Sequence, residues 1–264
     1  MRALIRFVGL VSASLSLLTP FGCGPADARL TGDELVVEQA ISSGTTVQPG
    51  SPVARSTLMF LSKETKGQHG CSASLIDDSH ALTAAHCGKG AARLTDVVLL
   101  FATAYAPDAV TRPVTAVFTR RDWPFDGSGD ISVVEFSGGV PSGFVPVALA
   151  SRLPIAAKMP PLIHAGFGQT TSTVNDRGTL HAVPGVLKEF LEGPARYVAT
   201  DDHGSICSGD SGGPDYVRVG TGDRLVQVGV HVSGSCDNGS VSVSTDVRAN
   251  IDWIRSTGAR PKLD

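Results

Sequence analysis

Charged side chains, aromatic side chains and basic clusters are all scarce in this sequence. Charged residues make up 18% of its 264 residues and aromatic residues 6%, and the formal net charge is −3. Nucleic-acid binding needs clustered lysine and arginine, and no basic run is present. Internal repeats and low-complexity tracts are also absent. The sequence therefore predicts no nucleic-acid partner and one compact unit.

Cysteine is scarce as well, with five residues and no Cys-x-x-Cys pair. The absence of that spacing argues against a zinc site, and we predict neither a metal nor another cofactor. Free buried thiols and disulfides are both compatible with the count. An odd number leaves at least one cysteine without an intramolecular partner. The five are Cys23, Cys71, Cys87, Cys207 and Cys236.

Glycine and proline are abundant instead, with 30 and 16 residues. They separate short runs rich in β-branched and apolar residues, a pattern typical of strands joined by turns. The composition therefore predicts an all-β fold. The strand-like runs are residues 58–61, 97–101, 114–118, 131–136, 225–232 and 241–243.

The N-terminal segment has the pattern of a secretory signal peptide. Arg2 and Arg6 precede an apolar stretch over residues 7–18, which is too short for a transmembrane helix. Cleavage after Ala28 would make residues 1–28 the signal peptide. Cleavage before Cys23 would instead leave residues 1–22 as the signal, with a lipidated cysteine at the new N-terminus.

Both cleavage alternatives stay open. Pro20 and Phe21 depart from the usual lipoprotein pattern, whereas the odd number of cysteines favours lipidation of Cys23. We therefore expect export, either as a secreted or periplasmic protein or as one anchored to a bacterial membrane by lipid.

The six residues from Gly209 to Pro214 have the pattern of an exposed nucleophile on a tight turn. Glycines on both sides of Ser211 permit unusual backbone conformations and keep bulk away from a substrate. Backbone N–H groups around such a turn can also converge on a developing oxyanion. Ser211 is therefore a candidate nucleophile.

Two upstream fragments contain the partners that a serine nucleophile needs. His86 ends a run of small apolar residues, and Asp130 directly precedes a strand-like run. A serine hydroxyl needs a base to take its proton, and the base needs a carboxylate to fix its tautomer. His86 and Asp130 are the candidates for these two roles.

With the order His86, Asp130, Ser211, the chain resembles the chymotrypsin-like (trypsin-like) serine proteases, and a bacterial secreted member in particular. Matching motifs extend from Ile41 to Trp253. The resemblance implies two six-stranded antiparallel β-barrels with the active site between them, followed by a C-terminal helix. It also implies that the N–H groups of Gly209 and Ser211 form the oxyanion hole.

The resemblance further implies a domain plan and two disulfides. Residues 41–258 would form the protease domain and residues 259–264 a C-terminal tail, with the helix within residues 246–256. Cys71 would pair with Cys87, and Cys207 with Cys236. Disulfides require an oxidising compartment, in agreement with export.

Activation by cleavage before Ile41 is a further implication of the resemblance. The freed α-amine would pair with Asp210, which makes residues 29–40 a short pro-region of a zymogen. Ser42 and Ser43 depart from the family's apolar-then-glycine pattern, and Ala40 argues against a trypsin-like activating protease. The alternative is an inert extension before a buried Ile41.

The implied substrate pocket contains Ser205, Ile206, Gly234 and Ser242. The residue six before the catalytic serine lies at the pocket base in the family, and here it is the neutral Ser205. A cationic substrate side chain would be buried there without a partner. We therefore predict cleavage after small or medium apolar residues.

The segment from His231 to Cys236 departs most from the family pattern, because it lacks the usual tryptophan and is one residue short. We expect His231 to be a partly exposed strand residue, with a place in the substrate cleft as the alternative.

These observations predict a monomeric serine endopeptidase that acts on proteins or peptides and is open to protein inhibitors. One alternative is a non-catalytic homologue that serves as a binding module. An α/β-hydrolase esterase also has a Gly-x-Ser-x-Gly motif, but its triad order requires a histidine well after the serine. Only His231 follows Ser211, and it is too close.

Overall fold

The computed structural model describes eight segments of the chain: residues 44–64, 67–89, 94–120, 129–152, 161–191, 196–200, 204–236 and 240–264. The predicted signal peptide and pro-region, with Cys23 and Ile41, lie outside the described residues. Across these segments, no helix has the length and apolar character needed to cross a bilayer.

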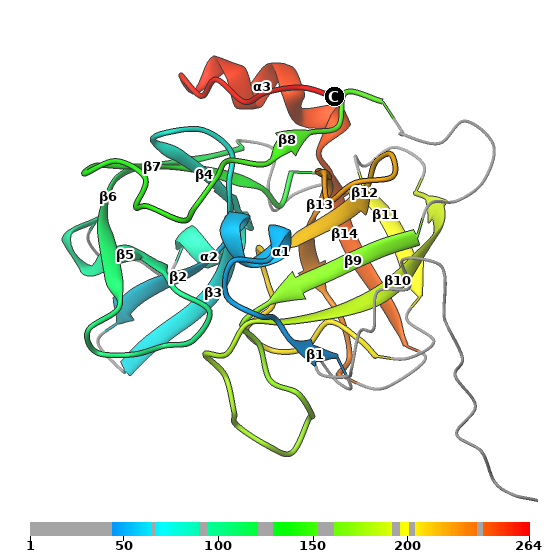
Figure 1. Cartoon of the computed structure of the whole chain (residues 1–264), viewed down its shortest axis with the longest axis horizontal. Helices are drawn as coiled ribbons and strands as arrows, with labels where there is room; N and C mark the ends of the chain where they lie inside the picture. The colour runs from blue at the N-terminus through cyan, green and yellow to red at the C-terminus, as the bar shows by residue number, and fades with distance from the viewer. Residues whose placement is uncertain are drawn as a thin grey trace, which may run out of the picture. The chain divides into compact units, whose positions relative to one another are not determined.

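The first half of the described chain forms a closed antiparallel barrel (Figure 1). Its strands pair in the order β2-β3-β4-β7-β6-β5. Their bounds are β2 Thr57–Glu64, β3 Gly67–Leu75, β4 His80–Thr83, β5 Val97–Phe101, β6 Val110–Thr119 and β7 Ser132–Phe136.

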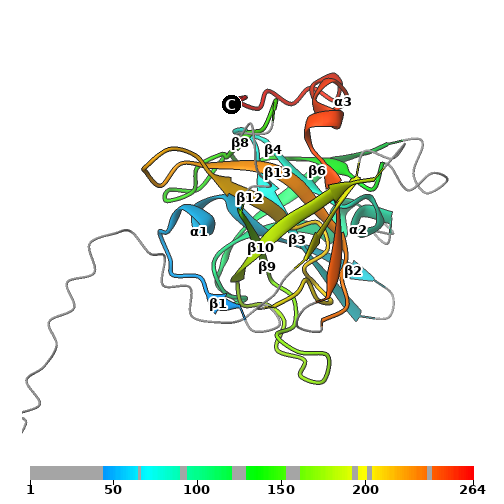
Figure 2. The same ribbon diagram turned by 90° about the vertical axis from the view of Figure 1, so that its right-hand side faces the viewer.

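The second half forms another six-stranded barrel, closed where β9 pairs with both β12 and β10 (Figure 2). Two short strands extend this sheet, since β1 (Thr45–Thr46) pairs with β10 and β8 (Ala148–Leu149) pairs with β13. The barrel strands are β9 Pro161–Gly166, β10 His181–Phe190, β11 Arg196–Thr200, β12 Pro214–Arg218, β13 Leu225–Ser233 and β14 Val241–Asp246.

The prediction of two antiparallel six-stranded barrels with a C-terminal helix is therefore confirmed. Five of the six strand-like runs lie within strands, and the sixth, residues 131–136, starts one residue before β7. The antiparallel barrels also exclude the α/β-hydrolase alternative, whose sheet is parallel. The strands that the sequence pattern did not indicate include β3, whose glycine and polar residues obscure the alternation.

Helices are few and short in the described part of the chain. They are α1 (Pro52–Ser56), α2 (Ala85–Lys89) and α3 (Ile251–Ser256), with 3₁₀ turns at Leu94–Asp96 and Arg248–Asn250. The C-terminal helix is shorter than predicted, because Asp246 still belongs to β14. Residues 259–264 then run beside β8, where the N–H of Leu149 donates to the carbonyl of Lys262 over 2.9 Å.

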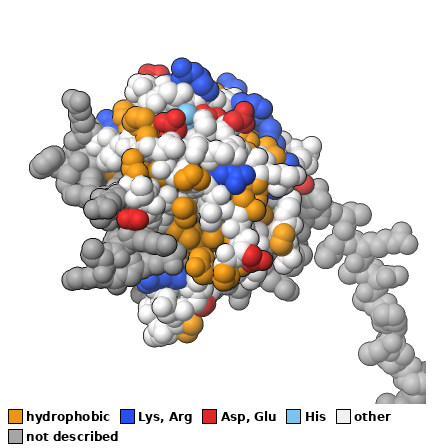
Figure 3. Space-filling model, turned by 90° about the vertical axis from the view of Figure 1, so that its left-hand side faces the viewer, with side chains coloured by type: hydrophobic (Ala, Val, Ile, Leu, Met, Phe, Trp, Pro, Cys, Tyr) orange, Lys and Arg blue, Asp and Glu red, His pale blue; other side chains and the backbone are white. Residues whose placement is uncertain are grey.

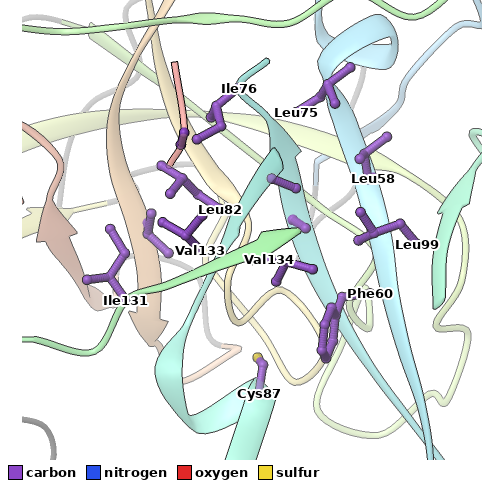
Figure 4. Packing of buried hydrophobic residues seen from close by; sticks show 14 of the residues in the cluster. Leu58, Phe60, Leu75, Ile76, Leu82, Cys87, Leu99, Ile131, Val133 and Val134 are labelled. Atoms are coloured by element: carbon purple, nitrogen blue, oxygen red, sulfur yellow. The ribbon is translucent and has the colours of Figure 1, made fainter. Parts of the chain in front are cut away.

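Each barrel has its own apolar interior. The close-up in Figure 4 shows apolar side chains of the first-barrel core gathered between strands, and α3 contributes Ile254 to the same cluster. The β5 sequence Val-Val-Leu-Leu-Phe supplies branched and aromatic side chains, four of the five buried. Such side chains suit a pleated surface that is packed on its inner face.

The face in Figure 3 carries hydrophobic side chains among interspersed acidic and basic ones.

A further apolar cluster joins the two barrels. Met59 and Leu100 of the first barrel pack with Phe167 and Tyr216 of the second. The hydroxyls of Tyr216 and Thr57 are 3.0 Å apart, and both residues are fully buried. This contact fixes the barrels against each other.

Candidate active site

His86 and Asp130 are in direct contact, as their assigned roles require. The Nδ1 atom of His86 lies 2.8 Å from Oδ2 of Asp130, and the His86 backbone N–H donates to Oδ1 over 3.0 Å. Asp130 is 5% exposed, whereas the His86 side chain is 33% exposed. An ionised carboxylate accepts only, so Nδ1 carries the hydrogen and Nε2 is left as the basic nitrogen.

Both barrels contribute to the position of this pair. His86 lies in α2, directly after β4, and Asp130 lies just before β7, so both side chains come from the first barrel. Thr245 of β14 in the second barrel donates its hydroxyl to the carbonyl of Asp130 over 3.1 Å. The disulfide between Cys71 and Cys87 anchors α2 to β3.

Ser211 lies beside the His86 turn. Its carbonyl accepts the N–H of Ser72 over 2.9 Å, and the Sγ atom of Cys87 is 3.6 Å from the same oxygen. Cys87 follows His86 directly, so the main chain of Ser211 is held next to the histidine. The structure thus pairs His86 with Asp130 and places the main chain of Ser211 against Cys87, the residue after His86.

The glycines around Ser211 are required by close packing. Gly209 and Gly212 have φ of 102° and 81°, a region that L-residues rarely adopt. A Cβ on Gly212 would overlap the hydroxyl of Thr83 and approach the carbonyl oxygen of Ser72 to 2.5 Å. A Cβ on Gly209 would approach Cα of Gly168 to 2.9 Å.

The N–H groups of Gly209 and Ser211 donate to no other group among the residues that the structure describes. They are therefore available to a ligand, as an oxyanion hole requires. The loop that carries them, residues 206–213, is held from several sides. Ser72 donates its hydroxyl to the carbonyl of Gly209 over 3.0 Å, and Arg177 donates to the hydroxyl of Ser208 over 2.9 Å.

Asp210 points away from solvent into a narrow socket. Its two carboxylate oxygens accept the N–H groups of Gly168 and Cys207, over 2.8 and 2.9 Å. Burial raises the pKa of Asp210, although these N–H groups and two nearby histidines oppose the rise. A Cβ at Gly166 or Gly168 would overlap the carboxylate, so the socket fits Asp210 closely.

Three of the four predicted pocket residues, Ser205, Ile206 and Gly234, lie close together. Ser205 and Ile206 are buried, and the Ser205 hydroxyl is 2.5 Å from that of Ser240. A Cβ on Gly234 would overlap the carbonyl oxygen of Ile206, so Gly234 lies against the pocket segment. The disulfide between Cys207 and Cys236 joins the two. Ser242 is buried on β14 beside Ala199.

The expectation for His231 is wrong. This residue is fully buried, neither partly exposed nor open to the cleft, and its ring points into the second barrel. Its Nε2 atom lies 2.7 Å from Oδ1 of Asp215, which also bonds Nδ1 of His164. The sequence analysis missed His164 and Asp215. The only sequence signal that could have indicated these two residues is that each is a polar residue within a short strand.

Among the residues that the structure describes, two groups of side chains have the types that ligate metals. In the first, Cys71 and Cys87 form a disulfide beside His86, so their sulfurs are not thiolates and the group suits no cation. In the second, the nitrogen and oxygen atoms of His164, Asp215 and His231 that would face a cation hydrogen-bond one another instead. Neither arrangement favours a metal.

Comparison with known families covers most of the chain. The family model described as Trypsin matches residues 41–254. The matched segment includes both barrels, both disulfides, His86, Asp130 and Ser211.

Replacing Gly212 by alanine tests the close packing around Ser211. We expect Gly212→Ala to lower the free energy of unfolding by about 1–2 kcal/mol through its positive φ. Overlap with Thr83 and Ser72 adds about 1–3 kcal/mol. Gly220→Ala is the matched control, because Gly220 has φ of 76° with no atom within 4 Å of an added Cβ. Urea unfolding measures both, and equal losses would contradict the packing argument.

Proposed function

The chain belongs to the trypsin family, and from this premise we propose that it is a serine endopeptidase that cleaves proteins or peptides through an acyl-enzyme. The observation that carries the proposal is the pair of contacts between His86 and Asp130, next to a glycine-enclosed Ser211. The alternative of a non-catalytic binding module has no comparable support, since all three triad positions are occupied.

In the proposed acylation step, the Oγ atom of Ser211 attacks the carbonyl carbon of the scissile bond. Nε2 of His86 takes the serine proton and then delivers it to the leaving amine. Asp130 holds the ring in the tautomer that leaves Nε2 basic and stabilises the imidazolium that forms. Water attacks the acyl-enzyme in the second half, with His86 again acting as the base.

The N–H groups of Gly209 and Ser211 would stabilise the negative oxygen of the tetrahedral intermediate. This role is supported by the observation that neither N–H group donates to another group among the described residues. Preorganised donors of this kind contribute strongly because they need no reorganisation as charge develops.

We propose that the protein is exported and made as a zymogen. The two disulfides fit an oxidising compartment. Cleavage before Ile41 would free an α-amine for Asp210, whose buried carboxylate forms no ion pair with another described residue. Residues 29–40 would then be the pro-region, and Cys23 would mark the lipid-anchored alternative.

The proposed preference is for small or medium apolar side chains. Ser205 is neutral, and its hydroxyl is occupied by Ser240 and the carbonyl of Ile206. An arginine or lysine side chain would therefore enter without a charge partner, which is costly in a desolvated pocket.

Two substitutions test the catalytic roles. We expect Ser211→Ala to abolish burst acylation and reaction with a fluorophosphonate probe. Asp130→Asn should lower kcat by about 10⁴-fold, because an amide at this position holds His86 in the wrong tautomer. Ser137→Ala, at an exposed turn serine, is the control and should leave kcat unchanged. Full activity of Ser211→Ala would overturn the assignment.

Introducing one negative charge at the pocket base tests the proposed substrate preference. The natural enzyme should have a higher kcat/KM for leucyl or alanyl than for arginyl substrates. Ser205→Asp should reverse this order, because it places a carboxylate at the pocket base, while the neutral Ser205→Asn should not. A natural preference for arginyl substrates would contradict the proposed pocket.

Mass spectrometry of the purified, active protein tests processing and anchoring together. We expect a chain that starts at Ile41 in the active form, and a start at any other residue would contradict the zymogen proposal. Fatty-acid labelling of the precursor, with Cys23→Ser as control, separates the two export routes. Label that Cys23→Ser removes identifies the lipoprotein.

A further inference from the structure

Four buried polar side chains lie beneath the loop that carries Ser211, and the proposed mechanism uses none of them. They come from four strands of the second barrel and are all at most 1% exposed. They are His164 of β9, Tyr197 of β11, Asp215 of β12 and His231 of β13. Buried polar groups of this kind are costly unless they are mutually satisfied.

Asp215 is the centre of this group. Its Oδ1 atom bonds Nδ1 of His164 and Nε2 of His231, and its Oδ2 atom accepts the hydroxyl of Tyr197. Burial alone would raise the pKa of Asp215, but the two histidines hold it well below its ordinary value. Burial and the Asp215 charge raise the pKa of Tyr197 well above its ordinary value, so Tyr197 is a neutral donor.

His231 has an acceptor at each ring nitrogen. Nε2 faces the Asp215 carboxylate at 2.7 Å, and Nδ1 faces the backbone carbonyl of Asp210 at 3.2 Å. A carbonyl and an ionised carboxylate can only accept hydrogen bonds. Both nitrogens must therefore carry hydrogen for both bonds to form, and a ring with two N–H groups is an imidazolium.

The same residue is bonded to the Ser211 loop at three points. Its backbone N–H donates to the carbonyl of Gly213 over 2.8 Å, and its carbonyl accepts the N–H of Gly212 over 2.9 Å. The ring bond to the Asp210 carbonyl is the third. These contacts surround Ser211 on both sides in sequence.

The loop contains a buried negative charge that needs compensation. Asp210 is fully buried, and its carboxylate contacts are the N–H groups of Gly168 and Cys207. The charges of His231 and His164 act on it in the stabilising direction, against the effect of burial. The cation therefore lies beside the anion whose orientation determines where the Gly209 and Ser211 N–H groups point.

We propose that His231 is a buried imidazolium, fixed by Asp215, which acts as a positioning residue for the Ser211 loop and as an internal counter-charge for Asp210. The inference rests on the proposed peptidase function and deepens it. The loop is held through its main chain from the second barrel, independently of the α-amine at Ile41. The uncleaved chain therefore retains part of the reactive arrangement.

The charge state is measured directly. Protein labelled with ¹⁵N-histidine should show two ring N–H groups for His231 at pH 7, assigned by their loss in His231→Gln. In Asp215→Asn one of them should disappear. A neutral His231 in the natural protein would overturn the proposal, as would a stoichiometric metal ion detected by mass spectrometry and lost in His231→Gln.

Kinetics test the positioning role. In the processed enzyme, we expect His231→Gln and Asp215→Asn to slow acylation by about 10²-fold, the size of a small misplacement of reacting groups, with KM little changed. The uncleaved chain should react slowly with a fluorophosphonate, and His231→Gln should abolish this reaction. His80→Gln is the matched control, because His80 also pairs with an aspartate, Asp77, at 2.8 Å. Its acylation rate should equal that of the natural enzyme.

The outcomes separate the two proposals. If the natural enzyme neither hydrolyses peptides nor reacts with the probe, the proposed function fails, while the ring N–H measurement still decides the state of His231. If the natural enzyme is active and a folded His231→Gln acylates at the same rate, the positioning role is overturned. Should His231→Gln fail to fold, Asp215→Asn and the spectrum of the natural protein decide.

Discussion

The position of Ser211 depends on a close approach of main chains that leaves no room for side chains. Within the loop over residues 206–213, the segment 209–213 is hydrogen-bonded by Ser72 from the first barrel and by His231 from the second. At Gly212 an added Cβ would overlap atoms of the first barrel. At Gly213 it would overlap the carbonyl oxygen of Ala165 in the second. The nucleophile is therefore positioned by the fit between two separate cores rather than by its own local sequence.

The same dependence explains how the barrels cooperate. His86 and Asp130 come from the first barrel and Ser211 from the second, and Thr245 reaches across to the Asp130 carbonyl. The apolar cluster around Tyr216 fixes the distance between the barrels. A shift of either barrel would separate the base from the nucleophile without changing any residue of the triad.

Much of this arrangement could be predicted from the sequence. Residues with one chemical role and a fixed chain order, such as His86, Asp130 and Ser211, are recognisable because their chemistry restricts the residue types. The disulfides follow from the same resemblance, and the structure contains both. The length of α3 and the strands rich in glycine or polar residues were less predictable, because weak alternation leaves tertiary packing to decide.

The group around Asp215 could not be predicted from the sequence, for a different reason. His164, Asp215 and His231 lie far apart in the chain, and each alone is compatible with an ordinary strand residue. Their inward direction follows from the register of β9, β12 and β13, in which Asp215 lies opposite His164. A one-residue change of register would turn each of them outward, so only the assembled barrel reveals the group.

The buried group also restricts how the sequence can diverge. Removing Asp215 alone leaves one or two histidines without their acceptor, and removing His231 alone leaves a carboxylate short of a donor inside the barrel. Either intermediate is strongly destabilised, because a buried charge without its partner is costly. An exchange of this interior for an apolar one must therefore pass through several simultaneous replacements. Descendants of this chain should inherit His164, Asp215 and His231 as a set, or lose all three together.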